Sequence, residues 1–164
     1  MKPLQHLKQL ILEDGKKRHP NMPAHAIAVN VWTTAKPEKR ELRRICKFIE
    51  LSGGIANITD SSAVRIDNRK SYVDSVGFNR TIGSVEFRKN PNFKAGHSDI
   101  SAVWHGAALF IELKRIYSKG KDSQSKLQKV FEESVTQSGG TYVIVHSFEH
   151  FYEWATEINF IKPI

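Results

Sequence analysis

Gly96-His97-Ser98-Asp99-Ile100 and Ala108-Leu109-Phe110-Ile111-Glu112-Leu113-Lys114 are the two stretches that decide the expected fold. Both contain the small, β-branched or apolar residues that are typical of strands. His105-Gly106 lies between them and favours a tight turn, so the two stretches are expected to pair as a hairpin. In such a hairpin Asp99 approaches Glu112, and strand alternation places Glu112 and Lys114 on one face.

Two carboxylates and one ammonium group at the end of an apolar strand are costly unless they pair with one another or bind a metal. Carboxylate oxygens suit Mg²⁺, which keeps several waters and also accepts phosphate oxygens. A metal at this position would lower the pKa of a bound water, and Lys114 would orient that water or stabilise developing charge. The alternative is a structural salt bridge at a strand end, which is the common role of a lone Glu-x-Lys.

Asp99 followed by Glu112-Leu113-Lys114 resembles the Asp…Glu-x-Lys signature of the PD-(D/E)XK nuclease superfamily. The closer resemblance is to its VRR-Nuc branch, which is related to the Holliday-junction resolvases. Further residues agree with that branch, namely Gly96, Ser125, Gln128 and the run from Gly139 to Val145. The resemblance covers roughly residues 84–154, and Ser98 departs from it by standing where the superfamily name has proline.

The resemblance implies an α/β fold with a restriction-endonuclease-like core, in which helices flank a mixed central β-sheet. It places one nuclease domain over residues 1–164, with an N-terminal helix and extension at 1–35 and the nuclease core at 36–156. The implied activity is Mg²⁺-dependent endonucleolytic hydrolysis of DNA phosphodiester bonds, with Mn²⁺ as a substitute metal.

The same resemblance assigns roles to individual residues. Asp99 and Glu112 would hold the metal together with the backbone carbonyl of Leu113. Lys114 would position or activate the attacking water, and Gln128 would support the site from the following helix. A glutamate of the first core helix often holds metal in such nucleases, and the candidates here are Glu38 and Glu41. For each of these two alone, a surface carboxylate near a helix N-terminus is the commoner role.

Composition bounds the partners of the chain. The formal net charge of +8 favours a polyanionic partner such as DNA, although lysine-rich surfaces often bind nothing. Cys46 is the only cysteine, so an intramolecular disulfide is excluded and a reducing cytoplasm is expected. No apolar run approaches the roughly 20 residues that span a bilayer, so no membrane association is expected.

Basic residues on two segments are candidate DNA contacts. Arg69, Lys70 and Arg80 lie among aromatic and small residues, in a pattern that resembles a region preceding the nuclease core in some VRR-Nuc-like proteins of phages and mobile elements. An ordinary hairpin with turn residues has the same composition. After the Glu-x-Lys strand, Arg115, Lys119 and Lys121 are placed to bind the scissile strand.

Periodicity predicts the remaining elements. Helices are expected over 3–13, ended by Gly15, and over 37–51, where Pro37 suits the first turn. A third helix is expected after a Ser123 cap, with an inner stripe of Leu127, Val130, Phe131, Ser134 and Val135, and a fourth begins near Phe148. Strands are expected over 55–59, 63–66, 84–88 and 141–145, with a short extended piece at 26–32.

Three functions from different classes remain open on the sequence alone. The first is the nuclease, selective for a junction, flap or nick, or acting on linear duplex. The second is a catalytically inactive DNA-binding module of the same fold, and the third is a basic scaffold that binds another protein. A resolvase-like enzyme would be expected to form a homodimer, but no dimer surface can be identified from the sequence.

Overall fold

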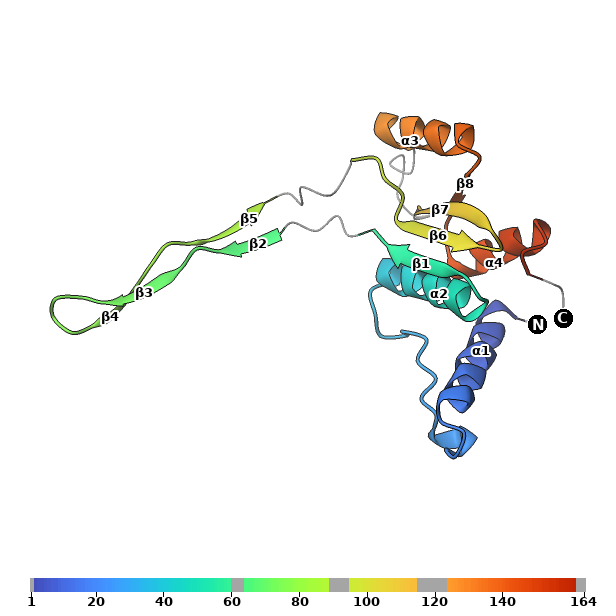
Figure 1. Cartoon of the computed structure of the whole chain (residues 1–164), viewed down its shortest axis with the longest axis horizontal. Helices are drawn as coiled ribbons and strands as arrows, with labels where there is room; N and C mark the ends of the chain where they lie inside the picture. The colour runs from blue at the N-terminus through green and yellow to red at the C-terminus, as the bar shows by residue number, and fades with distance from the viewer. Residues whose placement is uncertain (1, 60–63, 89–94, 115–123, 162–164) are drawn as a thin grey trace. The chain divides into compact units, whose positions relative to one another are not determined.

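A computed structural model describes the chain except for residues 1, 60–63, 89–94, 115–123 and 162–164. Its contacts divide the chain into two compact units, one of Met1–Thr59 with Gly96–Ile164 and one of Asp60–Ala95. The first unit holds a four-stranded sheet and four α-helices, which confirms the expected mixed α/β class (Figure 1).

The sheet of the first unit has the strand order β1-β6-β7-β8. Its strands are β1 (Ile55–Ile58), β6 (Ile100–Trp104), β7 (Ala107–Leu113) and β8 (Thr141–Val145). β6 is antiparallel to both β1 and β7, whereas β8 runs parallel to β7. The sheet is therefore mixed, as the sequence predicted.

β6 and β7 form the predicted hairpin. His105 and Gly106 make the turn with φ values of 49° and 80°, the positive pair that a tight two-residue hairpin requires. The first strand is shorter than expected, because β6 begins at Ile100 and not at Gly96. Gly96 has a φ of 90°, and a Cβ there would lie 2.7 Å from the carbonyl oxygen of Leu127. The close approach of the next helix thus explains both the glycine and the late start of the strand.

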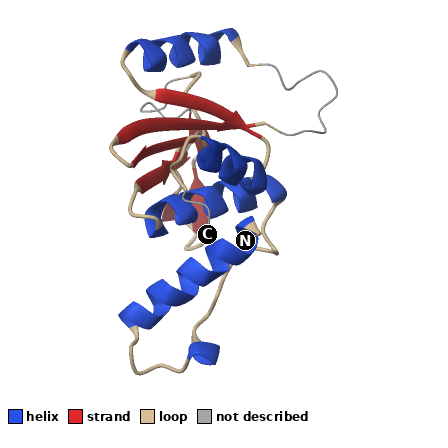
Figure 2. Cartoon of the chain, turned by 90° about the vertical axis from the view of Figure 1, so that its right-hand side faces the viewer, coloured by secondary structure: helices blue, strands red, loops and turns tan. Residues whose placement is uncertain are grey.

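Helices α1 (Pro3–Arg18), α2 (Pro37–Leu51) and α4 (Phe148–Glu157) lie on one face of the sheet (Figure 2). The bounds of α2 are those predicted from its apolar stripe. Phe48 of α2 packs edge-on against Trp104 of β6 and Phe148 of α4, with ring centroids 6.1 Å and 5.7 Å apart. Leu7 and Ile11 join α1 to the same buried core.

One expectation for the N-terminal segment was wrong. Gly15 does not end α1, because the helix continues to Arg18. The basic residues of its last turn interact favourably with the negative end of the helix dipole. Gly15 is buried instead, and a Cβ there would meet the Ile27 side chain, so the residue allows close packing. The expected extended piece at 26–32 has no strand; it begins in the short 3₁₀ helix η1 (Ala24–Ala26).

Helix α3 (Lys126–Gln137) covers the opposite face of the sheet (Figures 1 and 2). Phe131 contacts Phe110 and Tyr142 on that face, and Val135 is buried. The predicted inner stripe was partly wrong, since Leu127 and Val130 are exposed: a single helix on a small sheet buries a narrower face than its apolar residues suggest. Ser125 caps the helix, while the expected cap, Ser123, lies outside the described residues.

The second unit consists of two short antiparallel ladders. β2 (Val64–Asp67) pairs with β5 (Val85–Arg88), and β3 (Lys70–Val73) pairs with β4 (Asn79–Ile82). Asn68 donates a backbone hydrogen bond to Ser84 between the ladders, so together they form a two-stranded ribbon. The predicted strands at 63–66 and 84–88 correspond to β2 and β5 to within a residue.

Candidate active site

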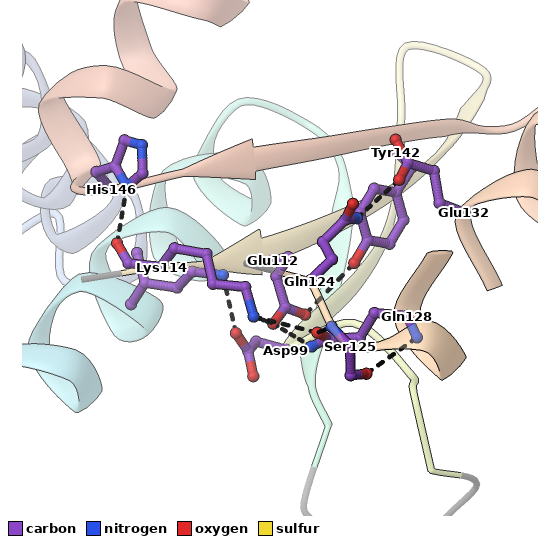
Figure 3. Close-up of polar contacts among 10 residues, drawn as sticks. Asp99, Glu112, Lys114, Gln124, Ser125, Gln128, Glu132, Tyr142 and His146 are labelled. Atoms are coloured by element: carbon purple, nitrogen blue, oxygen red, sulfur yellow. Dashed lines mark hydrogen bonds and ion pairs between the residues drawn. The ribbon is translucent and has the colours of Figure 1, made fainter. Parts of the chain in front are cut away.

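The hairpin brings the Asp99 carboxylate to the end of β7. Ile100 pairs with Ile111, so Asp99 lies one residue beyond the ladder, opposite Glu112. Its Oδ2 accepts a hydrogen bond of 2.8 Å from the backbone N–H of Leu113 (Figure 3). This contact joins Asp99 to the strand that carries Glu112, in agreement with the expectation that Asp99 approaches Glu112.

Glu112 is the centre of the polar cluster. Its side chain is 5% exposed, and its Oε1 pairs with the ammonium group of Lys114 at 2.8 Å. The Nε2 group of Gln128 donates to the same oxygen, and the Tyr142 hydroxyl donates to Oε2 at 3.5 Å (Figure 3). A carboxylate this deeply buried requires such partners, because leaving it unpaired would cost several kcal/mol.

The start of α3 carries Gln128 into this cluster. Ser125 and Gln128 form a capping box, in which the Ser125 hydroxyl accepts from the Gln128 N–H and the Gln128 side chain accepts from the Ser125 N–H. The Gln128 Oε1 also accepts from Lys114 at 3.2 Å. Gln128 therefore joins the helix cap to both residues of the Glu-x-Lys pair. Gln124, one turn earlier, donates instead to Glu132 at 2.7 Å.

Asp99 lies in an environment that disfavours its charge. Burial raises the pKa of Asp99 to about 6, and the negative charges of Glu112 and Glu38 raise it further. The N–H of Leu113 and the charge of Lys114 act in the opposite direction and do not compensate. A bound cation would relieve this crowding of carboxylates, which is the electrostatic condition expected of a metal site.

The structure distinguishes the two helix glutamates. Glu41 is buried and accepts from Arg40, Arg44 and the backbone N–H of Phe148, at 2.8 Å, 3.2 Å and 2.9 Å, so it joins α2 to the start of α4. Glu38 lies one turn earlier on α2, close enough to raise the pKa of Asp99. Of the two candidates, Glu38 is the one whose charge acts on Asp99.

A pocket borders the cluster on the side of α2. Its lining includes Lys36, Glu38, Arg40, Leu113 and His146. His146 follows β8 and donates from Nδ1 to the Lys114 carbonyl oxygen at 2.9 Å. Its ring stacks on that of His150 with centroids 5.3 Å apart, so the two histidines are neighbours, although they do not share one helix as a metal pair would.

Sequence reasoning did not identify the roles of Tyr142 and His146. Tyr142 is polar within the apolar strand Thr141–Val145, and the parallel register pairs it with Phe110 on the face that carries Glu112. That register depends on how β8 pairs with β7, which no local pattern specifies. His97 is packed against Phe131 with ring centroids 4.3 Å apart, and its Nδ1 is buried without a partner among the described residues.

The residues expected to contact DNA belong in part to the second unit and in part to a segment outside the described residues. Arg69 and Arg80 lie in the second unit in exposed ion pairs, Arg69 with Asp67 and Arg80 with Asp74, each at 2.8 Å. Lys70 begins β3 and is exposed. Arg115, Lys119 and Lys121 lie outside the described residues.

The donor set fits Mg²⁺ better than a metal that needs many protein ligands. Within the described residues, no three His, Cys, Asp or Glu side chains are grouped as a metal cage. Mg²⁺ commonly uses one or two carboxylates, with water and substrate phosphate completing its shell. Asp99, Glu112 and the Leu113 carbonyl offer oxygen ligands of that kind at one strand end.

Comparisons with known proteins add no family. No protein-family model matches the chain, and neither curated proteins nor solved structures gave a significant match. Among the described residues, no helix is long and apolar enough to cross a membrane.

Proposed function

We propose that this protein is a Mg²⁺-dependent DNA endonuclease with a restriction-endonuclease-like core. One observation carries the proposal: the fold brings Asp99, Glu112 and Lys114 together at one strand end, with Gln128 bonded to both members of the Glu-x-Lys pair. A structural salt bridge explains Glu112 and Lys114. It does not explain a second, partly buried acidic group, Asp99, whose pKa is raised by burial and by the neighbouring carboxylates.

The mixed sheet supports this fold assignment. An antiparallel hairpin followed by a helical crossover to a parallel strand puts Glu112 of β7 beside the N-terminus of α3. In this arrangement Asp99 comes from the start of one strand, Glu112 and Lys114 from the end of the next, and Gln128 from the helix that follows. The set thus depends on three consecutive elements of a single supersecondary unit.

The ligands for Mg²⁺ would be Asp99, Glu112 and the carbonyl oxygen of Leu113, with Glu38 as the further carboxylate. When bound, the metal supplies charge neutralisation at the scissile phosphate and lowers the pKa of the attacking water. The reaction is hydrolysis: water adds to phosphorus, the P–O bond to the leaving sugar breaks, and a proton reaches that oxygen.

The protein's own residues orient this reaction. Lys114 lies within hydrogen-bond distance of both Glu112 and Gln128, so its ammonium group is placed to hold the attacking water or a non-bridging phosphate oxygen. Gln128 holds Glu112 in one orientation through its amide. Tyr142 donates to the other oxygen of Glu112 and limits rotation of that carboxylate.

The partner is proposed to be DNA, bound through the net positive charge of the chain and through the basic residues named above. Exposed ion pairs contribute little stability, so phosphates can replace Asp67 and Asp74 as the partners of Arg69 and Arg80. Action in the cytoplasm accords with the single cysteine, which is buried and unpaired.

The test is cleavage of labelled linear, nicked, flapped and four-way DNAs with Mg²⁺, with Mn²⁺ and with EDTA. Wild-type protein is expected to cut only with metal, and Asp99→Ala and Lys114→Ala are expected to lose cutting. Lys129→Ala is the matched control, because it removes an exposed lysine of α3 outside the cluster. The substrate cut fastest would define the structural preference.

The contrary result is equally clear. If folded protein binds DNA and cuts no substrate with either metal, the chain is a DNA-binding module with this arrangement of residues and no hydrolytic activity. If it neither binds nor cuts DNA in low salt, the proposed partner is wrong.

A further inference from the structure

His146 binds the backbone of Lys114 at the point where β7 ends. The ladder of β7 and β8 closes with the pair Leu113 and Val145, so Lys114 and His146 each lie one residue beyond it. The N–H of Lys114 donates to the Val145 carbonyl at 2.9 Å, and the carbonyl oxygen of Lys114 accepts from Nδ1 of His146 at 2.9 Å (Figure 3). A carbonyl oxygen only accepts, so Nδ1 carries a proton in this contact. The imidazole thus adds one hydrogen bond beyond the last backbone pair.

The start of α4 explains why a side chain provides this bond. In a parallel ladder a carbonyl oxygen accepts from a backbone N–H of the neighbouring strand. Here the chain leaves the ladder at once, because Ser147 is the N-cap of α4 and its hydroxyl accepts from the N–H of His150 at 3.1 Å. The ring of His146 therefore takes the place of the next backbone donor.

The ring of His146 is itself held by α4. His150 accepts at Nδ1 from the backbone N–H of His146 at 3.3 Å, and the two rings stack with an angle of 10° between their planes. Glu41 of α2 accepts from the N–H of Phe148 at 2.9 Å and so fixes the first turn of α4. The contact therefore joins Lys114 to a packed helix.

The backbone of Lys114 decides how its ammonium group enters the polar cluster. That group pairs with Glu112 at 2.8 Å and donates to Gln128 at 3.2 Å. Residues at the end of a strand open more easily than those in its interior, and Lys114 lies beyond the last ladder pair. A donor on its carbonyl oxygen opposes such opening and keeps the side chain on the face of Glu112.

We infer that His146 is a positioning residue for Lys114 and acts through the carbonyl oxygen of that residue. This inference rests on the proposed function, because the orientation of Lys114 affects cleavage only if its ammonium group holds water or phosphate. Groups that orient the residues of a metal site commonly contribute about 10–100-fold to activity. A misplacement of about 1 Å at a reacting centre has a similar cost.

The first test compares kcat and KM for Mg²⁺-dependent cleavage of a labelled DNA. His146→Ala removes the donor, whereas His146→Asn keeps an N–H donor at the same distance along the side chain as Nδ1. His146→Ala is expected to lower kcat about tenfold, with KM within about threefold of wild type. His146→Asn is expected to recover most of the lost rate. His25→Ala is the matched control, because it removes an exposed histidine of η1, and it should cut as wild type does.

The second test needs no cleavage. Hydrogen exchange of the Lys114 amide is followed by NMR in EDTA without DNA. Because His146 is exposed, its truncation removes no buried packing. His146→Ala is expected to speed exchange at Lys114 about fivefold and to leave the amides of Leu109 and Ile111 inside β7 unchanged. His146→Asn should exchange as wild type does.

The two tests separate this inference from the proposed function. A wild-type protein that cuts no DNA refutes the nuclease, and exchange at Lys114 then decides by itself whether His146 positions that residue. Unchanged exchange in His146→Ala would overturn the inference. So would an equal loss of kcat in His146→Ala and His146→Asn, which would give the ring a direct role in the reaction. A raised KM with unchanged kcat would also overturn it and make His146 a DNA contact.

Discussion

Glu41 and Glu38 lie one turn apart on α2, and the structure predicts opposite consequences for their removal. Glu41 joins α2 to the start of α4 by accepting from Arg44 and from the N–H of Phe148, and both side chains of the ion pair are about one-tenth exposed. Removing one partner of a buried pair leaves the other charge uncompensated and costs about 3–5 kcal/mol. Glu41→Ala should therefore lower the free energy of unfolding by about 3 kcal/mol or more.

In a chain of this length that loss lowers Tm by roughly 6–12 °C. Glu38→Ala should cost about 1 kcal/mol or less, because Glu38 is exposed and the interactions of exposed charges contribute little stability. The assay is thermal and urea unfolding followed by circular dichroism, in EDTA and again with Mg²⁺. Metal should raise the Tm of wild type and of Glu41→Ala, and raise that of Glu38→Ala less.

The result that refutes this reasoning is an exchange of roles. If Glu41→Ala has the same Tm as wild type and its Tm no longer rises with Mg²⁺, the ion pair with Arg44 contributes no stability and Glu41 is the ligand. The conservative change Glu41→Gln separates charge from shape, because glutamine keeps an acceptor for the Phe148 N–H but leaves Arg44 without a counter-charge. It should lie between wild type and Glu41→Ala in stability.

Three further outcomes follow from the site and the core. Because the folded-state pKa of Asp99 is raised from 3.8 to about 6, metal-free protein should lose stability as pH rises through that window. Asp99→Asn should remove this pH-dependent loss and raise the free energy of unfolding by about 1–2 kcal/mol at pH 7.5, a value reduced for the partial exposure of the carboxyl group. Urea unfolding in EDTA at several pH values measures the effect. A pH profile of stability that is the same in the variant and in wild type would contradict the prediction. Ser125→Ala should cost about 1 kcal/mol by removing the cap of α3, and should slow cleavage because that cap positions Gln128; equal melting of variant and wild type would argue against the cap. Cys46 should resist a thiol reagent at pH 8 in folded protein and react fully in urea, and fast labelling of the folded state would show that the helix opens.

Local chemistry predicted much of the sheet and its hairpin. His105-Gly106 predicted the turn because only a few residue types adopt two successive positive φ values, and the apolar run before Glu112 predicted the strand that follows. The bounds of α2 were predicted because Pro37 marks its start, Gly53-Gly54 its end, and the apolar stripe its buried face. These signals act between residues that are near one another in the chain.

Predictions from local sequence were wrong where contacts between distant segments determine the structure. Gly15 suits a helix end, yet the side chain of Ile27 packs against it inside α1. Leu127 and Val130 have the spacing of a buried stripe, yet α3 turns them toward solvent. In both cases the burial of the residue depends on which distant segment packs beside it in the folded chain.

By itself, then, the sequence determined an α/β chain in which one hairpin places Asp99 near Glu112 and Lys114. The tertiary structure decided which other groups reach them: Gln128 through the cap of α3, Tyr142 through the parallel register of β8, and Glu38 through the packing of α2. It also decided the role of Glu41, whose partner Phe148 is 107 residues away in the chain. The physical reason is that strand alternation and turn chemistry are local, whereas burial, pairing and pKa depend on segments that only folding brings together.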